Sequence, residues 1–249
     1  MNLGKPIAEG NTAQIYLYES KIVKVFNDYL PDTESTSEAY KQKYAYSCGL
    51  SVPKVLDVTK IDGKQAIIME YIKGRTLGDL LTEDIKQAEY YMNISVDIQL
   101  KIHRIAPGLL EPMTEKLHRQ IESAHNLDIR HKVILKQNMD AMKFENRLCH
   151  GDFHLFNLVL SDNGVSIIDW VDSSAGDIRA DVYRTYLLYS QYSTDLADMY
   201  LRIYCKKGGV SKSDVFQWAP IIAGARLSEI VPSENSKRLT DIINHYYPL

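Results

Sequence analysis

The sequence has few cysteines, no long apolar run and no excess of either charge. Its three cysteines are odd in number and far apart, which argues against a disulfide framework and fits reduced thiols in a cytoplasmic protein. No apolar stretch reaches the roughly 18 residues that a membrane-spanning helix needs, and residues 1–10 lack the layout of a signal peptide. These absences exclude the secreted, fibrous and membrane classes.

The charges nearly cancel, since 29 Lys and Arg stand against 32 Asp and Glu, for a net charge of −3. This balance provides neither a basic footprint for nucleic acid nor a cationic surface for an anionic membrane. We therefore expect no nucleic-acid or membrane partner, and nothing indicates an obligate protein partner. Repeats, low-complexity tracts and Pro/Gly-rich linkers are also missing, whereas a hydrophobic content of 45% can fill a sizeable core.

Short β-branched and aromatic runs dominate the chain up to about residue 70. Such runs, separated by turn residues, predict about five antiparallel strands. Four of these runs are Ile15–Tyr18, Lys21–Phe26, Val52–Val58 and Ala66–Tyr71. One helix is predicted from about Ser35 to Cys48, where Gly and Pro are absent.

Beyond Gly74 the pattern becomes mostly helical. Apolar residues between Tyr91 and Ile105 recur at steps of three and four, which favours a buried helix, although residues 96–102 also alternate as in a strand. A short β interruption is predicted from Leu148 to Asp169. The chain thus predicts an α+β fold with two lobes: a small antiparallel sheet lobe at 1–73, a hinge at about 70–74, and a larger, mainly helical lobe at 74–249.

The most informative segment is HGDFHLFN at residues 150–157, followed twelve residues after Asn157 by Asp169. An aspartate in a tight loop, an asparagine five residues later and a second aspartate after a hairpin are the groups that phosphoryl transfer from a nucleotide needs. Asp152 would orient or deprotonate the attacking hydroxyl. Asn157 and Asp169 would supply hard oxygen ligands, which Mg²⁺ prefers.

The segments HGDFHLFN and IIDW resemble the signature of the aminoglycoside phosphotransferase and choline kinase family, small-molecule kinases with a two-lobed, protein-kinase-like fold. The resemblance extends over most of the chain. It implies a Mg²⁺-dependent phosphotransferase that moves the γ-phosphate of ATP, or of GTP, to a hydroxyl. The acceptor would be a small molecule such as an aminoglycoside, a choline-like compound, a macrolide or a sugar metabolite.

The same resemblance assigns residues that would bind the nucleotide. Lys24 falls at the phosphate-binding strand lysine and Glu38 at the helix glutamate that pairs with it. Gly10 falls in the loop that covers the nucleotide, and backbone groups between Glu70 and Ile72 would contact the purine edge. Lys21 is a rival of Lys24, and Glu38 could instead be an ordinary first-turn glutamate that the helix dipole favours.

Several other residues near the motif carry weaker assignments. His150 is expected to fix the loop, and His154 either to contact the γ-phosphate or to pack. His103 is expected to be a core histidine with satisfied hydrogen bonds. Asp177 is expected to brace the loop, and Asp181 belongs to the aspartate pair that usually follows the magnesium aspartate in the family.

Two other functions compete with a kinase of small molecules. One is a catalytically silent nucleotide-binding pseudokinase, although every catalytic position is filled. The other is a metal-dependent hydrolase, because His150-x-Asp152-x-His154 offers three zinc ligand types close together. A protein kinase is disfavoured, because Gly10 is the only glycine of its loop and neither Asp-Phe-Gly nor Ala-Pro-Glu occurs.

Composition leaves the acceptor open. A polycationic aminoglycoside favours an acidic pocket, but residues 171–249 hold nine acidic and nine basic side chains. Folding could still bring Asp172, Glu229 and Glu234 together.

Overall fold

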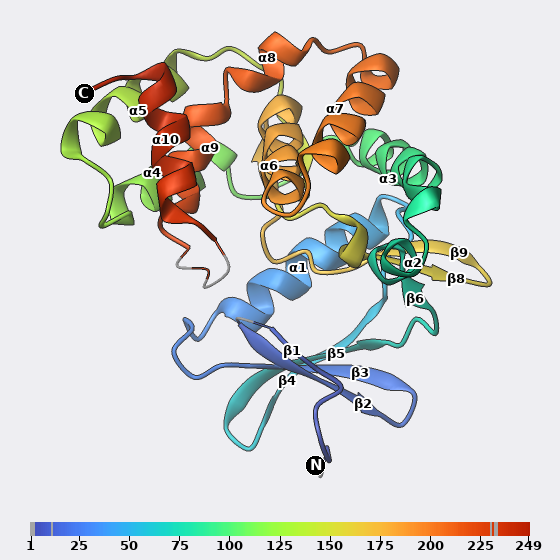
Figure 1. Cartoon of the computed structure of the whole chain (residues 1–249). Coiled ribbons are helices and arrows are strands. Elements are labelled where there is room, and N and C mark those ends of the chain that lie inside the picture. Colours follow the sequence, from blue (N-terminus) through green and yellow to red (C-terminus); the bar gives the residue numbers. More distant parts are fainter. Residues whose placement is uncertain (1–2, 11, 230, 232–233) are drawn as a thin grey trace. The chain divides into compact units, whose positions relative to one another are not determined.

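A computed structural model describes residues 3–10, 12–229, 231 and 234–249. The chain divides into two compact units, each built from two stretches of sequence (Figure 1). Unit 1 comprises the chain up to Glu83 together with Leu155–Asp172, and unit 2 comprises Asp84–His154 together with Ser173–Leu249. The predicted ranges 1–73 and 74–249 do not follow these bounds, and their assignment to a nucleotide-binding and a catalytic lobe stays a prediction.

Unit 1 is built on an antiparallel sheet of five strands in the order β1-β2-β3-β5-β4, accompanied by a second sheet in the order β6-β8-β9. The strands of the first sheet are β1 (Ala8–Glu9), β2 (Ala13–Tyr18), β3 (Lys21–Phe26), β4 (Val55–Ile61) and β5 (Lys64–Glu70). The second sheet consists of β6 (Arg75–Thr76), β8 (Leu158–Ser161) and β9 (Gly164–Ile167). The helical elements are α1 (Glu34–Ser47), α2 (Leu77–Glu83) and the 3₁₀ turn η2 (Leu155–Asn157).

The two faces of the five-stranded sheet bury different side chains because successive residues of a strand point to opposite sides. On β3, Ile22 and Phe26 pack in a cluster with Ala39 of α1. Val23 and Val25 belong to a second cluster on the other face. Lys24, between them in sequence, shares the face of Ile22 and Phe26, so its side chain is directed toward α1.

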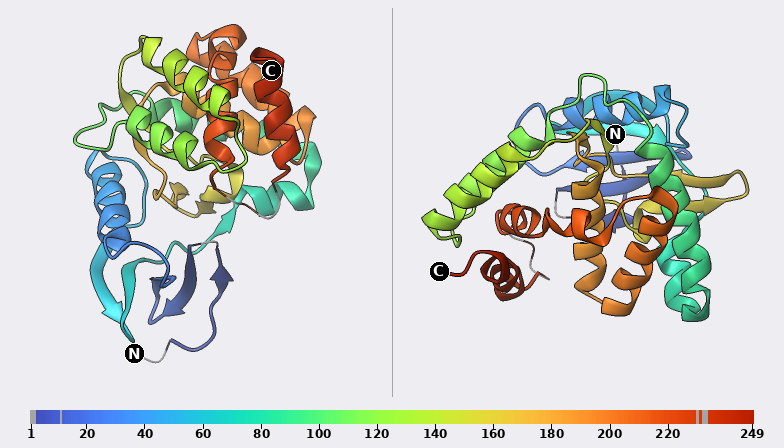
Figure 2. Two further views of the ribbon diagram at one scale, coloured as in Figure 1. Left: turned by 90° about the vertical axis from the view of Figure 1, so that its left-hand side faces the viewer. Right: turned by 90° about the horizontal axis from the view of Figure 1, so that it is seen from above.

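Unit 2 is mainly helical. Its helical elements are η1 (Ile85–Gln87), α3 (Ala88–Ile102), α4 (Met113–Ser123), α5 (Ile129–Ala141), α6 (Ile178–Ser190), α7 (Thr194–Gly208), α8 (Lys212–Phe216), α9 (Ala219–Arg226) and α10 (Ser236–Tyr246). A small antiparallel pair joins β7 (Arg147–Cys149) to β10 (Ser174–Gly176). Helix α7 packs against α3 and α6, whereas α9 packs against α4 and α10 (Figure 2). Trp218, Tyr200 and Tyr204 are fully buried among these helices.

The elements confirm the predicted α+β class and most of the predicted segments. Helix α1 matches the stretch predicted from Ser35, and the segment from Tyr91 is helical, so its alternative interpretation as a strand is wrong. The strands β6 and β10 were not predicted, because strands of two or three residues have no measurable periodicity. The three cysteines are free thiols.

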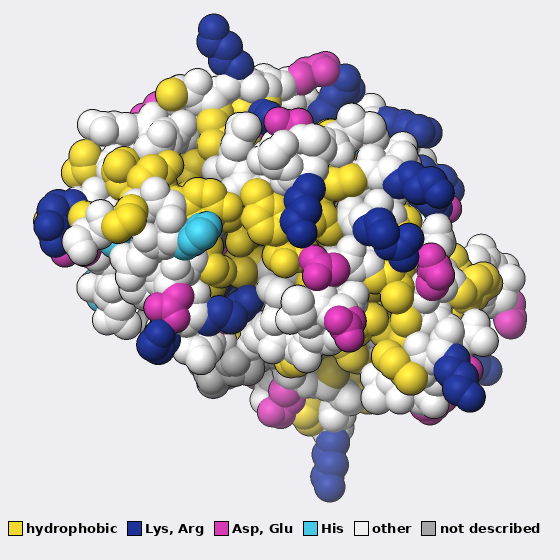
Figure 3. All heavy atoms as spheres, turned by 45° about the horizontal axis from the view of Figure 1, so that its top comes forward, with side chains coloured by type: hydrophobic (Ala, Val, Ile, Leu, Met, Phe, Trp, Pro, Cys, Tyr) yellow, Lys and Arg dark blue, Asp and Glu magenta, His cyan; other side chains and the backbone are white. Residues whose placement is uncertain are grey.

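Two further features concern the surface charges and the length of the helices. Acidic and basic side chains are interspersed over the face that Figure 3 displays. Within the described ranges, no helix combines the length and apolar character needed to cross a membrane.

Candidate functional site

Lys24 is the centre of a buried ion cluster within unit 1. Its Nζ donates to Oε1 of Glu38 on α1 at 2.7 Å and to Oδ1 of Asp169 at 3.0 Å. Lys24 and Glu38 are only 7% and 1% exposed, whereas the Asp169 side chain is 38% exposed. The rival Lys21 is exposed on the same strand. The fold therefore joins three residues, predicted from three distant segments, into one cluster that opens to solvent at Asp169.

The charges of this cluster support one another. Burial disfavours the charge on Lys24, but the Asp169 and Glu38 carboxylates outweigh burial and hold the pKa of Lys24 above its ordinary value. Burial also raises the pKa of Glu38, and Lys24 partly offsets this effect. The buried Oε2 of Glu38 has no hydrogen-bond partner among the described residues. Lys24 is thus a fixed cation at neutral pH, and Glu38 depends on it for compensation of its charge.

The hairpin of β8 and β9 brings Asn157 and Asp169 together at its open end, opposite the turn at residues 162–163. Leu158 of β8 pairs with Ile167 of β9, and the Ile168 N–H donates to the Asn157 carbonyl at 3.0 Å. Asp169 has a φ of 63°, a left-handed conformation that non-glycine residues seldom adopt and that is typical of functional sites. An amide oxygen and a carboxylate at one hairpin end form a donor set that fits Mg²⁺.

Gly10 occupies the turn between β1 and β2. Its N–H donates to the Ala13 carbonyl at 2.9 Å, which closes the turn tightly. Asn11 of this turn lies outside the described residues. The contact of Gly10 with a nucleotide stays a prediction.

The predicted hinge follows β5. The Glu70 N–H donates to the Lys54 carbonyl at 3.0 Å, so this N–H is not free to bind a purine. Ile72 is partly buried in the irregular segment before β6. At Gly74 a Cβ atom would lie 2.1 Å from the Leu160 carbonyl oxygen, so only glycine fits where the chain passes β8. The purine contacts of Glu70 and Ile72 remain predictions.

Asp152 lies in unit 2, in the loop after β7. The Gly151 N–H donates to Asp181 at 2.7 Å, and the His150 N–H donates to the same carboxylate at 3.4 Å. Gly151 has a φ of 82°, a conformation that favours glycine at this point of the loop. The Asp152 side chain is 25% exposed, and its Oδ2 lies 3.4 Å from Nε2 of His154. His154 thus neighbours the carboxylate, and its contact with a phosphate stays a prediction.

The surroundings of Asp152 stabilise its ionised form. Burial acts to raise the pKa of Asp152, but His154, Arg184 and His150 together hold it below its ordinary value. The carboxylate is therefore ionised at neutral pH and is a weak base. Such a group orients a hydroxyl by accepting its hydrogen bond, and it takes the proton only as the hydroxyl becomes more acidic during reaction.

This lowered pKa predicts a specific acid dependence of stability. The stabilisation from ionised Asp152 is fully present above the unfolded pKa of about 3.9 and is lost as the pH falls toward the lower folded pKa. Between about pH 5 and pH 3, wild type should therefore lose more free energy of unfolding than Asp152→Asn. Urea unfolding at steps of pH measures the difference. Parallel curves for the two proteins would contradict the prediction.

Asp181 is itself braced by polar side chains from the C-terminal end of α3. His103 lies with Nε2 2.9 Å from the Asp181 carboxylate and with Nδ1 2.6 Å from the Tyr204 hydroxyl. Gln99 donates to the same carboxylate at 3.2 Å. Burial opposes the charge on Asp181, yet His103 and the Gly151 N–H keep its pKa lowered. The prediction that His103 is a satisfied core residue is confirmed.

Asp177 contacts the start of α6 and the buried Trp218. It caps α6 by accepting from the Arg179 N–H at 2.8 Å, and it also accepts from Nε1 of Trp218 at 3.0 Å. Arg179 closes an ion pair with it. Asp177 therefore braces the start of α6 and the packing of Trp218.

The structure does not support a zinc site at the motif His150-x-Asp152-x-His154. Within the described part of the chain, the His, Cys and acidic side chains that converge as a possible metal cluster are His103, Cys149 and Asp181. His103 and Asp181 are already hydrogen-bonded to each other, and burial raises the pKa of the Cys149 thiol well above its usual value. The His150, Asp152 and His154 side chains of the predicted motif are not among the converging residues of the described chain.

Unit 1 contains a paired lysine and two oxygen ligands at a hairpin end, and unit 2 contains an ionised loop aspartate. These are residue types that a nucleotide phosphotransferase needs. The model of the phosphotransferase enzyme family matches residues 4–219. The chain belongs to this family.

Solved structures show the same fold. A thermostable mutant of the aminoglycoside phosphotransferase APH(4)-Ia in apo form has a TM-score of 0.71 at 14% identity, over 98% of this chain and 95% of that chain. A choline/ethanolamine kinase family protein from Mesorhizobium loti has a TM-score of 0.62 at 14% identity, over 97% and 85% of the two chains. The predicted protein-kinase-like fold is confirmed.

Curated relatives are longer than this chain. Acyl-CoA dehydrogenase family member 11 from Pongo abelii is 24% identical over 226 residues, which cover 74% of this chain and 29% of the relative. The Homo sapiens protein of the same name is 26% identical over 186 residues, or 64% and 24% of the two chains. The chain therefore spans less than a third of these relatives.

Proposed function

We propose that this protein is a small-molecule kinase that transfers the γ-phosphate of ATP, with GTP as the alternative donor, to a hydroxyl. The cluster of Lys24, Glu38 and Asp169 carries the proposal. A lysine held by a buried glutamate is a fixed point charge for the α- and β-phosphates. Glu38 fixes its position, and Asp169 adds an oxygen ligand that is open to solvent. A solvated surface lysine lacks this orientation.

The other assigned residues divide the remaining work. Gly10 covers the phosphates, and backbone groups of Glu70 and Ile72 bind the purine edge. Asn157 and Asp169 hold Mg²⁺, which when bound neutralises charge on the phosphates. Asp152 aims the acceptor hydroxyl, whose oxygen forms the new bond to the γ-phosphorus as the bond to the β-phosphate oxygen breaks. The hydroxyl proton passes to Asp152 and then to solvent.

Related structures and the free thiols are consistent with this proposal. APH(4)-Ia, of similar fold, has also been solved as a ternary complex with ADP and hygromycin B. A small-molecule kinase with reduced cysteines suits the cytoplasm, where ATP is available. We therefore propose a cytoplasmic enzyme.

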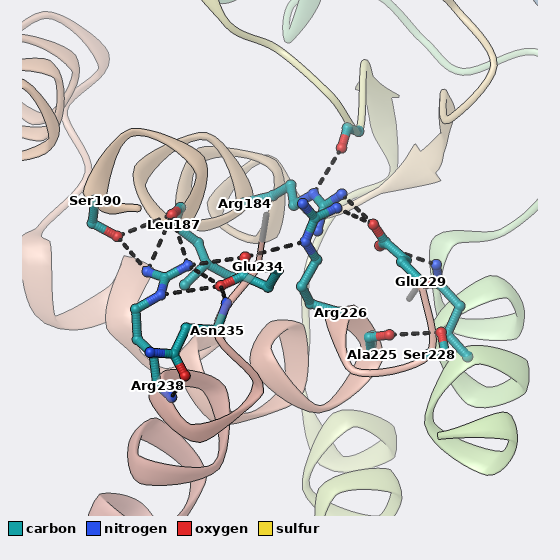
Figure 4. A network of polar contacts seen from close by, with 12 residues as sticks. Arg184, Leu187, Ser190, Ala225, Arg226, Ser228, Glu229, Glu234, Asn235 and Arg238 are labelled. Carbon is teal, nitrogen blue, oxygen red and sulfur yellow. Dashed lines mark hydrogen bonds and ion pairs between the residues drawn. The ribbon is translucent and has the colours of Figure 1, made fainter. Parts of the chain in front are cut away.

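The charges around Glu229 and Glu234 are relevant to whether the acceptor is a polycation. Glu229 and Glu234 do lie near each other, but arginines pair with both (Figure 4). Glu229 pairs with Arg184 at 2.8 Å and also with Arg226. Glu234 pairs with Arg226 at 3.4 Å and with Arg238 at 2.8 Å. Because three guanidinium groups neutralise two carboxylates, these glutamates offer no net attraction to a polycation. The charge of these two glutamates therefore gives a polycationic aminoglycoside no added support over the other proposed acceptors.

Asp169→Asn should weaken the binding of MgADP by about 10- to 100-fold, because the change removes a charged oxygen ligand from the hairpin end. Isothermal titration calorimetry measures the affinity with and without Mg²⁺. Asp162→Asn is the matched control, since Asp162 is exposed at the opposite end of the same hairpin. Equal affinities of Asp169→Asn and Asp162→Asn would remove Asp169 from the metal site.

The proposed function is tested by MgATP turnover across a panel of choline, ethanolamine, sugars, macrolides and aminoglycosides. Asp152→Asn is assayed beside the wild type. Turnover that disappears in the variant would support the kinase and identify its acceptor class. Binding of MgATP with no transfer to any acceptor would instead favour the catalytically silent protein.

A further inference from the structure

One helix holds both polar groups of Gly151, the residue just before Asp152. Asp181 and Arg184 lie three residues apart on α6, so both face the same side of the helix. Asp181 accepts from the Gly151 N–H at 2.7 Å. Nε of Arg184 donates to the Gly151 carbonyl at 3.2 Å. The two contacts together fix the orientation of the peptide groups on either side of Gly151, including the one that leads into Asp152.

Arg184 is itself held by a series of ion pairs. The Arg184 guanidinium is buried, and its Nη2 donates to Glu229 at 2.8 Å. Because a planar guanidinium donates in fixed directions, this anchor determines where Nε points. Removing Glu229 would take the carboxylate of an ion pair away from a buried cation, which is unfavourable.

The series continues and returns to α6 (Figure 4). Arg226 contacts both Glu229 and Glu234. Arg238 pairs with Glu234 at 2.8 Å and donates to the Ser190 hydroxyl at 2.9 Å. Ser190 is the last residue of α6. The ring of alternating charges therefore starts at Arg184 and closes on the same helix.

We infer that Arg184, anchored by Glu229, is a positioning residue for Asp152. The inference rests on the proposed function, because it assigns Arg184 a role in the same transfer. Arg184 acts through the Gly151 carbonyl, which sets the direction of the Asp152 backbone. It also places a positive charge near Asp152 and contributes to the lowered pKa of that carboxylate. Arg184 need not touch either substrate.

Arg184→Gln should lower kcat by about 10- to 100-fold, since small displacements of a catalytic group have effects of this size. The KM for MgATP should stay within about two-fold, because the proposed nucleotide residues all belong to unit 1. The acidic limb of the pH profile of kcat should move to higher pH, because a positive charge near Asp152 is lost. Turnover is measured with the acceptor found in the panel, or as MgATP hydrolysis if none is found.

A conservative variant separates charge from geometry. Arg184→Lys keeps the positive charge but cannot donate in two fixed directions, so kcat should recover only in part while the acidic limb returns toward that of wild type. Glu229→Gln should lower kcat in the same direction as Arg184→Gln. Arg202→Gln is the control, because Arg202 forms an exposed ion pair with Glu89 on the surface of unit 2.

The outcomes distinguish this inference from the proposed function. Wild-type kcat in Arg184→Gln, beside an inactive Asp152→Asn, would overturn the inference and leave the kinase intact. Full turnover in both variants would count against the assignment of Asp152 itself. Losses of kcat that follow equal losses of MgADP affinity and melting temperature would show a structural role alone, which also overturns the inference.

Discussion

Asp152→Asn should lower kcat by about 10²- to 10⁴-fold while MgATP affinity changes little, because the variant keeps the size of the side chain but loses the negative acceptor. The effect should fall on kcat, since the Asp152 loop belongs to unit 2 and the proposed nucleotide residues to unit 1. Steady-state turnover and MgADP titration on the same preparations measure the two quantities.

The control for this variant is Asp140→Asn, which removes an exposed carboxylate of unit 2 that pairs with His118. It should retain wild-type kcat. If Asp152→Asn also retained wild-type kcat, Asp152 would not orient the acceptor. A large loss of MgADP affinity in Asp152→Asn would instead indicate a role in nucleotide binding, contrary to the proposal.

Lys24→Met should lose most turnover and also destabilise the fold. Removing one partner of a buried ion pair leaves the other charge uncompensated, which costs about 3–5 kcal/mol. Glu38 is almost fully buried, and its Oε2 has no hydrogen-bond partner among the described residues, so loss of Lys24 removes the ion pair that compensates its charge. Urea unfolding measures the free energy of unfolding, and kcat/KM for MgATP should fall by about 100-fold or more, as expected for loss of a positioned charge.

The double variant Lys24→Met/Glu38→Leu separates stability from function. Replacing a buried ion pair with apolar side chains is often neutral or stabilising, so the double variant should recover much of the lost stability. Turnover should stay low because the cation that binds phosphate is still missing. Recovery of turnover together with stability would show that Lys24 matters only for folding.

The burial of Lys24 and the proximity of Asn157 to Asp169 follow from local features of the sequence. Lys24 could be preferred over Lys21 because apolar residues flank it on a strand, and the structure confirms that only Lys24 is buried. Asn157 and Asp169 could be paired because a hairpin turn lies between them, and strand pairing then brings their flanking residues together. These predictions depend on periods of two and on turn residues, which are local properties.

The support of the Asp152 loop could not be predicted in the same way. Asp181 and Arg184 contact Gly151 from about 30 positions further along the chain, and no periodicity links them to it. The pairing of Arg184 with Glu229 depends on how α6 packs near the end of α9. Such contacts arise from tertiary packing, so neither spacing nor propensity reveals them.

The interleaved course of unit 1 has a consequence for the order of folding during synthesis. Lys24 and Glu38 leave the ribosome early. The β8–β9 hairpin and Asp169 follow only after helices α3, α4 and α5 of unit 2. At a translation rate of about 5–20 residues per second, this interval lasts roughly 5–30 s. The five-stranded sheet is synthesised long before β8 and β9, and until they follow, the ion cluster of Lys24, Glu38 and Asp169 is incomplete. A fragment that stops at the hinge never receives Asn157 or Asp169.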